Sequence, residues 1–160
     1  MNLTIRNIEP QDDQTMGEIV QNSLENRGLA ISGTAYFDPY LFHLSEVYKA
    51  KKSDYWVLEK NGKIIGGGGF GPFGRYKKIG ELQKLYILDE EQGNGYAHML
   101  MKQIIETAKQ DYEELYIETF KSLNTANQLY LKYGFVSLSQ PLEGSEHGAC
   151  DTWLLKKLSK

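Results

Sequence analysis

Residues 82–108 join a short apolar run, a loop with two glycines and an amphipathic segment. The apolar run from Leu82 to Leu88 is typical of a buried strand. Apolar residues then recur with the period of a helix that buries one face: Ala97, Leu100, Met101, Ile104, Ile105 and Ala108. The first N–H groups of a helix are unpaired and its dipole is positive at that end, so this unit predicts an anion-binding site.

The loop itself reads Gln92-Gly93-Asn94-Gly95-Tyr96-Ala97. It lacks the Gly-Lys-Ser/Thr ending of a nucleotide P-loop, and His98 stands where the dinucleotide fingerprint has its third glycine. The spacing Gln-x-x-Gly-x-Ala instead resembles the acyl-CoA pyrophosphate loop of the GNAT superfamily of N-acetyltransferases.

A second segment carries the same resemblance. Residues 126–135 read Ala-Asn-Gln-Leu-Tyr-Leu-Lys-Tyr-Gly-Phe, similar to the family signature Ala-x-x-Leu-Tyr-x-x-x-Gly-Phe. One departure is Leu123, because family members often have Asn three residues before that Ala. The resemblance extends over nearly the whole chain and points to the bacterial stand-alone branch that acts on small molecules.

Elsewhere the sequence predicts alternating strands and helices. Strands are expected at residues 3–6, 54–59, 63–70, 82–88, 115–119, 135–138 and 150–155, and helices near 10–24, 38–48, 97–108 and 125–132. This alternation predicts an α/β fold with about seven strands. The resemblance implies a GNAT fold: a mixed, mostly antiparallel sheet, splayed at its middle and flanked by about four helices, with residues 1–160 forming one domain.

Two local features add to this prediction: the start of the second helix and a run of glycines in the third strand. Asp38-Pro39 is expected to cap and begin the second helix. The aromatics of this region, Tyr36, Phe37, Tyr40 and Phe42, are expected in the core rather than in contact with a ligand. Four consecutive glycines, Gly66–Gly69, weaken a strand, so they indicate either close approach of a ligand or backbone, or a bulge in a twisted sheet.

Composition excludes several classes of protein. A net charge of −3 gives no basic field for nucleic acid, and no apolar run approaches the 18 residues of a membrane helix. A single cysteine, Cys150, favours a reducing, cytoplasmic location. The three histidines lie far apart without ligand spacing, so no metal site is expected.

By resemblance, the co-substrate is acetyl-CoA. Its pantetheine arm is expected to bond the backbone near Leu85, Tyr86 and Ile87, and the short helix is expected to contribute Asn127 and Tyr130. The loop residues expected to bind the pyrophosphate are Gln92, Gly93, Asn94, Gly95, Tyr96 and Ala97.

Three residues are candidates for proton transfer. Tyr130 occupies the family position of the acid that protonates the departing thiolate, although a packed core tyrosine is the alternative. Glu81 lies 92 − 81 = 11 residues before Gln92, similar to the glutamate base of the histone-acetylating branch, although it could be a solvated strand-end carboxylate. Glu118 is its rival as base, or an anchor for a cationic substrate; His147 and Cys150 are weaker candidates.

The leading hypothesis is an acetyl-CoA-dependent N-acetyltransferase that acts on a primary amine of a small molecule by direct attack in a ternary complex. One alternative is a protein N-terminal or lysine acetyltransferase, and another is a non-catalytic acyl-CoA-binding regulatory module. The expected partner is the amine alone, with no nucleic acid and no membrane, and a homodimer is left open.

Overall fold

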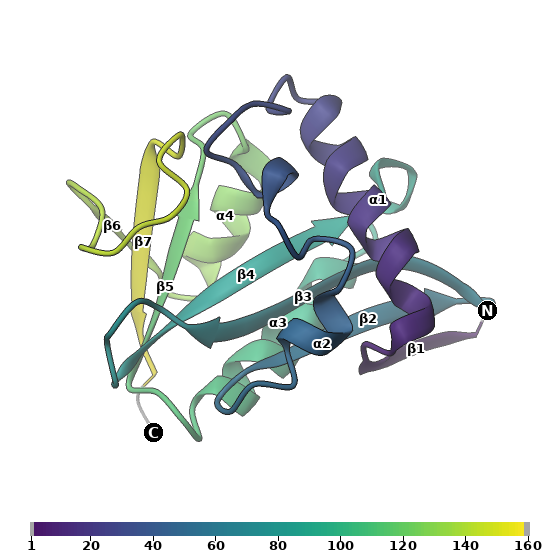
Figure 1. Cartoon of the computed structure of the whole chain (residues 1–160), viewed down its shortest axis with the longest axis horizontal. Helices are drawn as coiled ribbons and strands as arrows, with labels where there is room; N and C mark the ends of the chain where they lie inside the picture. Colours follow the sequence, from purple (N-terminus) through teal and green to yellow (C-terminus); the bar gives the residue numbers. More distant parts are fainter. Residues whose placement is uncertain (1, 159–160) are drawn as a thin grey trace.

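A computed structural model describes residues 2–158 as an open sheet of seven strands between two layers of helices (Figure 1). The strand order is β1-β2-β3-β4-β5-β7-β6, and every neighbouring pair is antiparallel except β4 and β5. The bounds are β1 Leu3–Asn7, β2 Asp54–Lys60, β3 Lys63–Pro72, β4 Ile79–Ile87, β5 Glu114–Thr119, β6 Val136–Leu138 and β7 Thr152–Lys157. The predicted mixed, mostly antiparallel sheet is confirmed.

Four α-helices lie in this part of the chain: α1 Asp13–Glu25, α2 Leu44–Val47, α3 Tyr96–Ala108 and α4 Asn124–Lys132. Short 3₁₀ turns lie at Pro10–Asp12, Ala35–Phe37 and Asp89–Glu91. In Figure 1, α1 and α2 cover one face of the sheet, and α3 and α4 lie behind it. Each face therefore has its own apolar core. No helix within residues 2–158 combines the length and apolar character needed to cross a bilayer.

The prediction of a second helix starting at Asp38 was wrong in its bounds. Residues 39–42 form turns, and α2 holds only Leu44–Val47. The Asp38 carboxylate does not cap a helix, because it pairs with Lys84 and His147 instead. Phe37 and Tyr40 are 61% and 65% exposed, so these two aromatics were wrongly placed in the core.

The four glycines of β3 lie where neighbouring atoms leave no room for a side chain. A Cβ at Gly66 would lie 2.6 Å from the Tyr86 carbonyl oxygen, and one at Gly67 would lie 2.8 Å from the Trp56 carbonyl oxygen. Of the predicted explanations, close approach of another backbone therefore applies. A bulge applies as well, since the register between β3 and β4 shifts between Gly67 and Gly69.

The bulge lies in β4, where Lys84 and Leu85 face the shifted stretch of β3. Lys84 adopts a positive φ of 51°, and the Tyr55 hydroxyl donates a hydrogen bond of 2.7 Å to its carbonyl oxygen. A bulge bends its strand and redirects the side chains on it. The pairing of β4 with its neighbour on the other side, β5, ends at Glu81, just before this bulge.

The hydrogen-bonded pairing of β4 with β5 shows where the two strands separate. The two strands pair only from Ile79 to Glu81 on β4 and from Glu114 to Tyr116 on β5. Beyond Glu81 the strands have no pairing with each other, which leaves a gap in the middle of the sheet. The predicted splay is therefore present, and Glu81 lies at the point where it begins.

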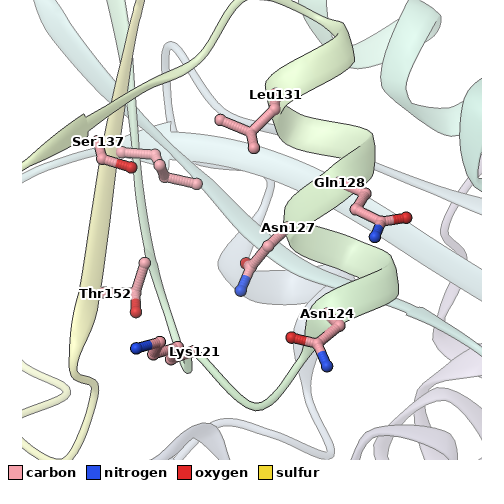
Figure 2. Close-up of a pocket in the computed structure, with 8 residues that line it drawn as sticks. Lys121, Asn124, Asn127, Gln128, Leu131, Ser137 and Thr152 are labelled. Atoms are coloured by element: carbon pink, nitrogen blue, oxygen red, sulfur yellow. The ribbon is translucent and has the colours of Figure 1, made fainter.

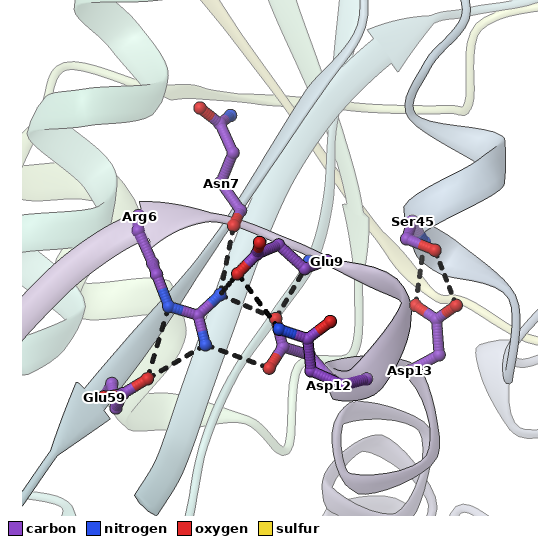
Figure 3. A network of polar contacts seen from close by, with 8 residues as sticks. Arg6, Asn7, Glu9, Asp12, Asp13, Ser45 and Glu59 are labelled. Carbon is purple, nitrogen blue, oxygen red and sulfur yellow. Dashed lines mark hydrogen bonds and ion pairs between the residues drawn. The ribbon is translucent and has the colours of Figure 1, made fainter. Parts of the chain in front are cut away.

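A polar network at the β1 edge of the sheet holds the start of α1 against β1 and β2 (Figure 3). We call Arg6, Glu9, Asp12 and Glu59 the Arg6 network. The Arg6 guanidinium donates to Asp12 at 2.7 and 3.0 Å and to Glu59 at 2.9 Å, and it pairs with Glu9 at 3.2 Å. Nearby, Asp13 accepts bonds from the Ser45 backbone N–H and hydroxyl, which ties α1 to α2.

Candidate active site

A cleft of about 860 Å³ occupies the gap between β4 and β5. Its walls come from β4, β5, the glycine loop at residues 92–97, the start of α3, α4, and two loops at residues 33–38 and 144–150. Segments that are far apart in the sequence thus converge on one cavity. Most of the site residues predicted from the sequence line it.

The glycine loop forms one end of this cleft. Gly93 and Gly95 adopt positive φ values of 84° and 79°, and a Cβ built at either position would meet no atom within 4 Å. Gly95 is the N-cap of α3, and the N-terminal end of a helix carries a partial positive charge. A backbone concavity at a helix N-terminus fits a phosphate group, so the loop can hold the pyrophosphate of acetyl-CoA.

The β4 wall of the cleft is formed by Leu85, Tyr86 and Ile87. Leu85 belongs to the bulge and the other two follow it, and β4 has no partner there on the β5 side. Backbone groups on that edge are therefore available to a ligand that lies along the strand. The expected contact of these three residues with the pantetheine arm therefore uses their main-chain groups and not their side chains.

Tyr130 projects from α4 into the cleft with only 5% of its surface exposed. Its ring packs against Phe135 at 5.9 Å between centroids. Among residues 2–158 its hydroxyl has no hydrogen-bond partner, and burial raises the pKa of the phenol well above its usual value. The hydroxyl is therefore protonated at neutral pH and has a proton to donate.

The opposite end of the cleft is acidic. Glu81, Glu118 and His147 each place one oxygen or nitrogen atom within 4.8 Å of the others, and we call this group the acidic end. Burial, followed by the negative charge of Glu118, raises the pKa of Glu81 to about 7. His147, a weaker candidate from the sequence, lies beside the two carboxylates. This donor set suits a positively charged group, either a metal ion or an ammonium.

Two side chains behind Glu81 fix its carboxylate. Gln83 Nε2 donates to Glu81 Oε1 at 2.8 Å, as expected for side chains that share one face of a strand. The Tyr48 hydroxyl donates in turn to Gln83 Oε1 at 2.6 Å. Because the tyrosine occupies the amide oxygen, the amide nitrogen faces Glu81. This bond from Gln83 opposes the upward shift of the Glu81 pKa.

Asp38 joins both sides of the acidic end. Its carboxylate lies 2.7 Å from Lys84 Nζ and 3.0 Å from His147 Nε2. Burial pushes the pKa of Asp38 upward, but these two partners outweigh it and lower the pKa below its usual value. The hydrogen bond that His147 Nε2 donates to the Asp38 carboxylate also raises the pKa of His147. A second tie lies close by, where the Ala149 N–H donates to the Gly33 carbonyl at 3.2 Å.

Cys150 also lines the cleft. Burial, followed by the charges of Glu118 and Glu81, raises the pKa of its thiol to about 12. A thiol in such surroundings stays protonated and is a poor nucleophile. The environment therefore disfavours an acyl-cysteine intermediate.

Two predicted cofactor residues do not line the cleft. Asn94 donates from Nδ2 to the Glu91 carbonyl at 3.0 Å and stabilises the loop itself. Asn127 projects from α4 toward the strands that carry Ser137 and Thr152, in a separate pocket (Figure 2). Its Nδ2 donates to the Phe120 carbonyl at 2.9 Å, so it fastens the turn between β5 and α4.

Three residues that surround the acidic end had not been singled out as site residues from the sequence. Gln83 and Lys84 lie on β4, and Asp38 lies more than forty residues earlier in the chain. A local pattern could not bring Asp38 together with the two β4 residues, because they come from segments that meet only through the packing of the fold. The only available signal was the alternation of Glu81 and Gln83 along one strand.

Comparison with known sequences agrees with this geometry. The model of the acetyltransferase (GNAT) family matches residues 22–135. The chain is also similar to the uncharacterized N-acetyltransferase YjgM of Escherichia coli (strain K12). The two are 32% identical over 157 residues, which cover 96% of this chain and 94% of the relative.

Solved structures show the same fold at low sequence identity. An acetyltransferase of the GNAT family from Staphylococcus aureus Mu50 superposes with a TM-score of 0.82 at 16% identity, covering 99% of this chain and 100% of that one. YncA from Salmonella typhimurium, solved with its cofactor acetyl-CoA, superposes with a TM-score of 0.79 at 20% identity, covering 100% of this chain and 96% of that one.

Proposed function

Because this chain belongs to the GNAT family of acetyltransferases, we propose that it transfers the acetyl group of acetyl-CoA to the primary amine of a small molecule. Acetyl-CoA lies in the cleft, with its pyrophosphate at the glycine loop and its pantetheine arm along the free edge of β4. The acceptor amine lies at the acidic end. The reaction takes place between them, near Tyr130.

The loops that close the cleft beside the acidic end are the observation that favours a small-molecule acceptor over a protein. The loops at residues 33–38 and 144–150 meet there through the Asp38–His147 pair and the Ala149–Gly33 backbone bond. Lys84 joins them from β4 through Asp38. An extended protein segment needs an open groove on both sides of the reacting residue, and these contacts close one side. A small molecule requires no such groove.

Glu81 is the proposed base. An amine arrives as an ammonium, which has no lone pair, so a proton must leave before attack. A base works best when its pKa lies near the operating pH, and the pKa of Glu81 is raised to about 7 by burial and by Glu118. Glu81 therefore accepts the ammonium proton, directly or through water, and Glu118 holds the amine in place.

Tyr130 is the proposed acid. The amine nitrogen bonds to the thioester carbonyl carbon, and the carbon–sulfur bond then breaks with the electron pair going to sulfur. Tyr130 donates its phenolic proton to that sulfur. During attack the carbonyl oxygen becomes negative, and a backbone N–H of β4 near Ile87 stabilises it. No covalent enzyme intermediate is required.

The loop assignment is tested by Gly95→Trp. A tryptophan side chain fills the open space in front of the loop, so binding of acetyl-CoA should fall below detection in calorimetry. Gly62→Trp is the matched control, because Gly62 also has a positive φ, of 81°, and no neighbour within 4 Å, but lies in the β2–β3 turn. Unchanged affinity in a folded Gly95→Trp protein would contradict the assignment.

The activity itself is tested with purified protein, acetyl-CoA and a panel of small amines, followed through release of free thiol. We expect turnover with at least one amine and none in the Gly95→Trp variant. Acetylation of lysine in peptides, without acetylation of any small amine, would favour a protein acetyltransferase. Binding of acetyl-CoA without turnover on either class would favour a regulatory module.

A further inference from the structure

The charges at the acidic end are not evenly matched. Three carboxylates gather there, from Asp38, Glu81 and Glu118, with two basic side chains, Lys84 and His147. Both basic side chains are engaged by Asp38, at 2.7 Å and 3.0 Å. Asp38 thus forms ion pairs with both cations, whereas neither glutamate forms an ion pair within residues 2–158.

The hydrogen bonds of the two glutamates come from neutral groups. Glu81 Oε1 accepts from the Gln83 amide at 2.8 Å, and Glu118 Oε2 accepts from the Tyr116 hydroxyl at 3.0 Å. Glu118 Oε1 is buried and has no partner among residues 2–158. A buried carboxylate oxygen without a partner is costly, so a ligand that supplies a donor would bind favourably here.

The remaining basic side chains of the cleft are elsewhere. Arg27 pairs with Asp89 at 2.9 Å, just before the glycine loop. His98 on α3 contacts Tyr133 at 3.2 Å, and Lys132 directly precedes that tyrosine on α4. These groups lie on the elements that surround the glycine loop. At the acidic end itself, within residues 2–158, both cations are already paired with Asp38.

We propose that the acceptor is a primary alkyl- or arylalkyl-amine whose amine-bearing carbon carries no carboxylate, and that α-amino acids are rejected. This rests on the proposed function and narrows it to one substrate class. One nitrogen with donors ~2.8 Å from each glutamate fits between oxygens that lie within 4.8 Å of each other. The gap therefore suits a single ammonium.

The carboxylate of an α-amino acid would be only two bonds from that nitrogen. It would bring a third negative charge against Glu81 and Glu118 in a half-buried site, where charges are poorly screened. We expect this repulsion to lower kcat/KM on the order of 10²-fold relative to the same amine without the carboxylate. Glu118 is the residue that sets this discrimination, since Glu81 takes up a proton during the reaction.

The test uses matched pairs of acceptors that differ only in the α-carboxylate: isobutylamine and valine, phenethylamine and phenylalanine, tyramine and tyrosine. The methyl esters of the three amino acids keep the added bulk without the charge. We expect acetylation of the amines and the esters, and kcat/KM on the order of 10²-fold lower for the amino acids. Equal or faster acetylation of the amino acids would overturn the proposal. Rejection of the esters as well would also overturn it, because shape would then be the cause.

Glu118→Gln is the diagnostic variant, with Glu113→Gln as control, because Glu113 is exposed and pairs with Lys78 outside the cleft. We expect Glu118→Gln to raise KM for the amines and narrow the gap between amine and amino acid, and Glu113→Gln to change neither. An unaltered gap in Glu118→Gln would overturn the assigned role.

Binding of phenethylamine and phenylalanine, followed by calorimetry, separates this proposal from the proposed function. Preference for the amine in a protein that acetylates nothing would contradict the proposed function and support the acceptor class. Preference for phenylalanine would overturn the acceptor class.

Discussion

The Arg6 network and the acidic end both bring carboxylates together beside β-strands, but they differ in what balances the charge. In the Arg6 network one guanidinium contacts Asp12, Glu59 and Glu9, with nitrogen–oxygen distances between 2.7 and 3.2 Å. At the acidic end, within the described residues 2–158, Glu81 accepts a hydrogen bond from an amide and Glu118 from a hydroxyl, both neutral groups. The two regions therefore affect ionisation in opposite directions.

The pKa shifts follow from this difference. Burial raises the pKa of Asp12, but the bonds from Arg6 and from the Glu9 N–H outweigh it and lower the pKa. Burial also raises the pKa of Glu81, and Glu118 adds to that shift, which brings the value to about 7. A paired carboxylate stabilises the fold, whereas a carboxylate with a raised pKa is poised for proton transfer and costs stability when ionised.

The largest effect is expected for Glu81→Gln. Without the base, kcat at neutral pH should fall on the order of 10³-fold and recover at high pH, where the amine loses its proton unaided. Because ionisation of Glu81 costs stability between pH 4.5 and about 7, the variant should be as stable as the wild type or more stable above that window. A pH–rate profile and denaturant unfolding at two pH values check both points; loss of stability above pH 7 would contradict them.

Asp12→Ala probes the other region. Removing one partner of a buried ion pair should lower the free energy of unfolding by roughly 3 kcal/mol at neutral pH, with kcat/KM of the folded enzyme unchanged. The pKa of Asp12 is lowered in the folded state, so its contribution is complete above the unfolded value of 3.8 and is lost as the pH falls through the folded value. The difference from the wild type should therefore shrink in acid.

Denaturant unfolding from pH 2 to pH 7 measures this effect. Glu106→Ala is a suitable control, since Glu106 forms an exposed pair with Lys109 at 3.4 Å. Such surface pairs contribute little. A decrease in kcat/KM for Asp12→Ala equal to that of Glu81→Gln would remove the distinction between the two regions.

Tyr130→Phe tests the acid, which lies between the glycine loop and the acidic end. The ring stays packed against Phe135 and only the hydroxyl is lost, so stability should hold while kcat falls on the order of 10²-fold. Tyr112→Phe is the control, because the Tyr112 hydroxyl donates to the Lys52 carbonyl outside the cleft. If chemistry is rate-limiting and kcat stays unchanged, Tyr130 is a packing residue.

The smallest expected effect concerns the support behind Glu81. Gln83→Leu removes the hydrogen bond that lowers the Glu81 pKa. The apparent pKa of the acid limb in the pH profile of kcat/KM should therefore rise by about one unit. Tyr48→Phe should move it less in the same direction, because the Gln83 amide is then free to rotate. A limb that does not move in either variant would show that these side chains do not position the carboxylate.

Local patterns determined the elements that surround the site. The period of apolar residues predicted α3 closely, and Asn61-Gly62 predicted the β2–β3 turn, where both residues have positive φ. Gly134, with φ of 89°, follows the end of α4 as expected. These features depend on a few neighbouring residues, so the sequence contains all the information they require.

The family motifs also placed the glycine loop and Tyr130 on the cleft. Asn127 shows where a motif is insufficient: it belongs to the same signature, yet it faces a second pocket and bonds the Phe120 carbonyl. Neighbouring residues on a helix point in different directions, and only the packing of α4 against the sheet decides which of them face the cleft.

The charge balance of the acidic end was decided by the tertiary structure alone. Asp38 was expected to cap a helix, but the bulge at Lys84 and the loop that carries His147 bring two cations to its carboxylate. The consequence is that, in the part of the chain that the structure describes, the cations pair with Asp38 and not with Glu81 or Glu118. Electrostatic energy depends on distance through space, and these distances are set by segments more than forty residues apart, so no local pattern could have predicted them.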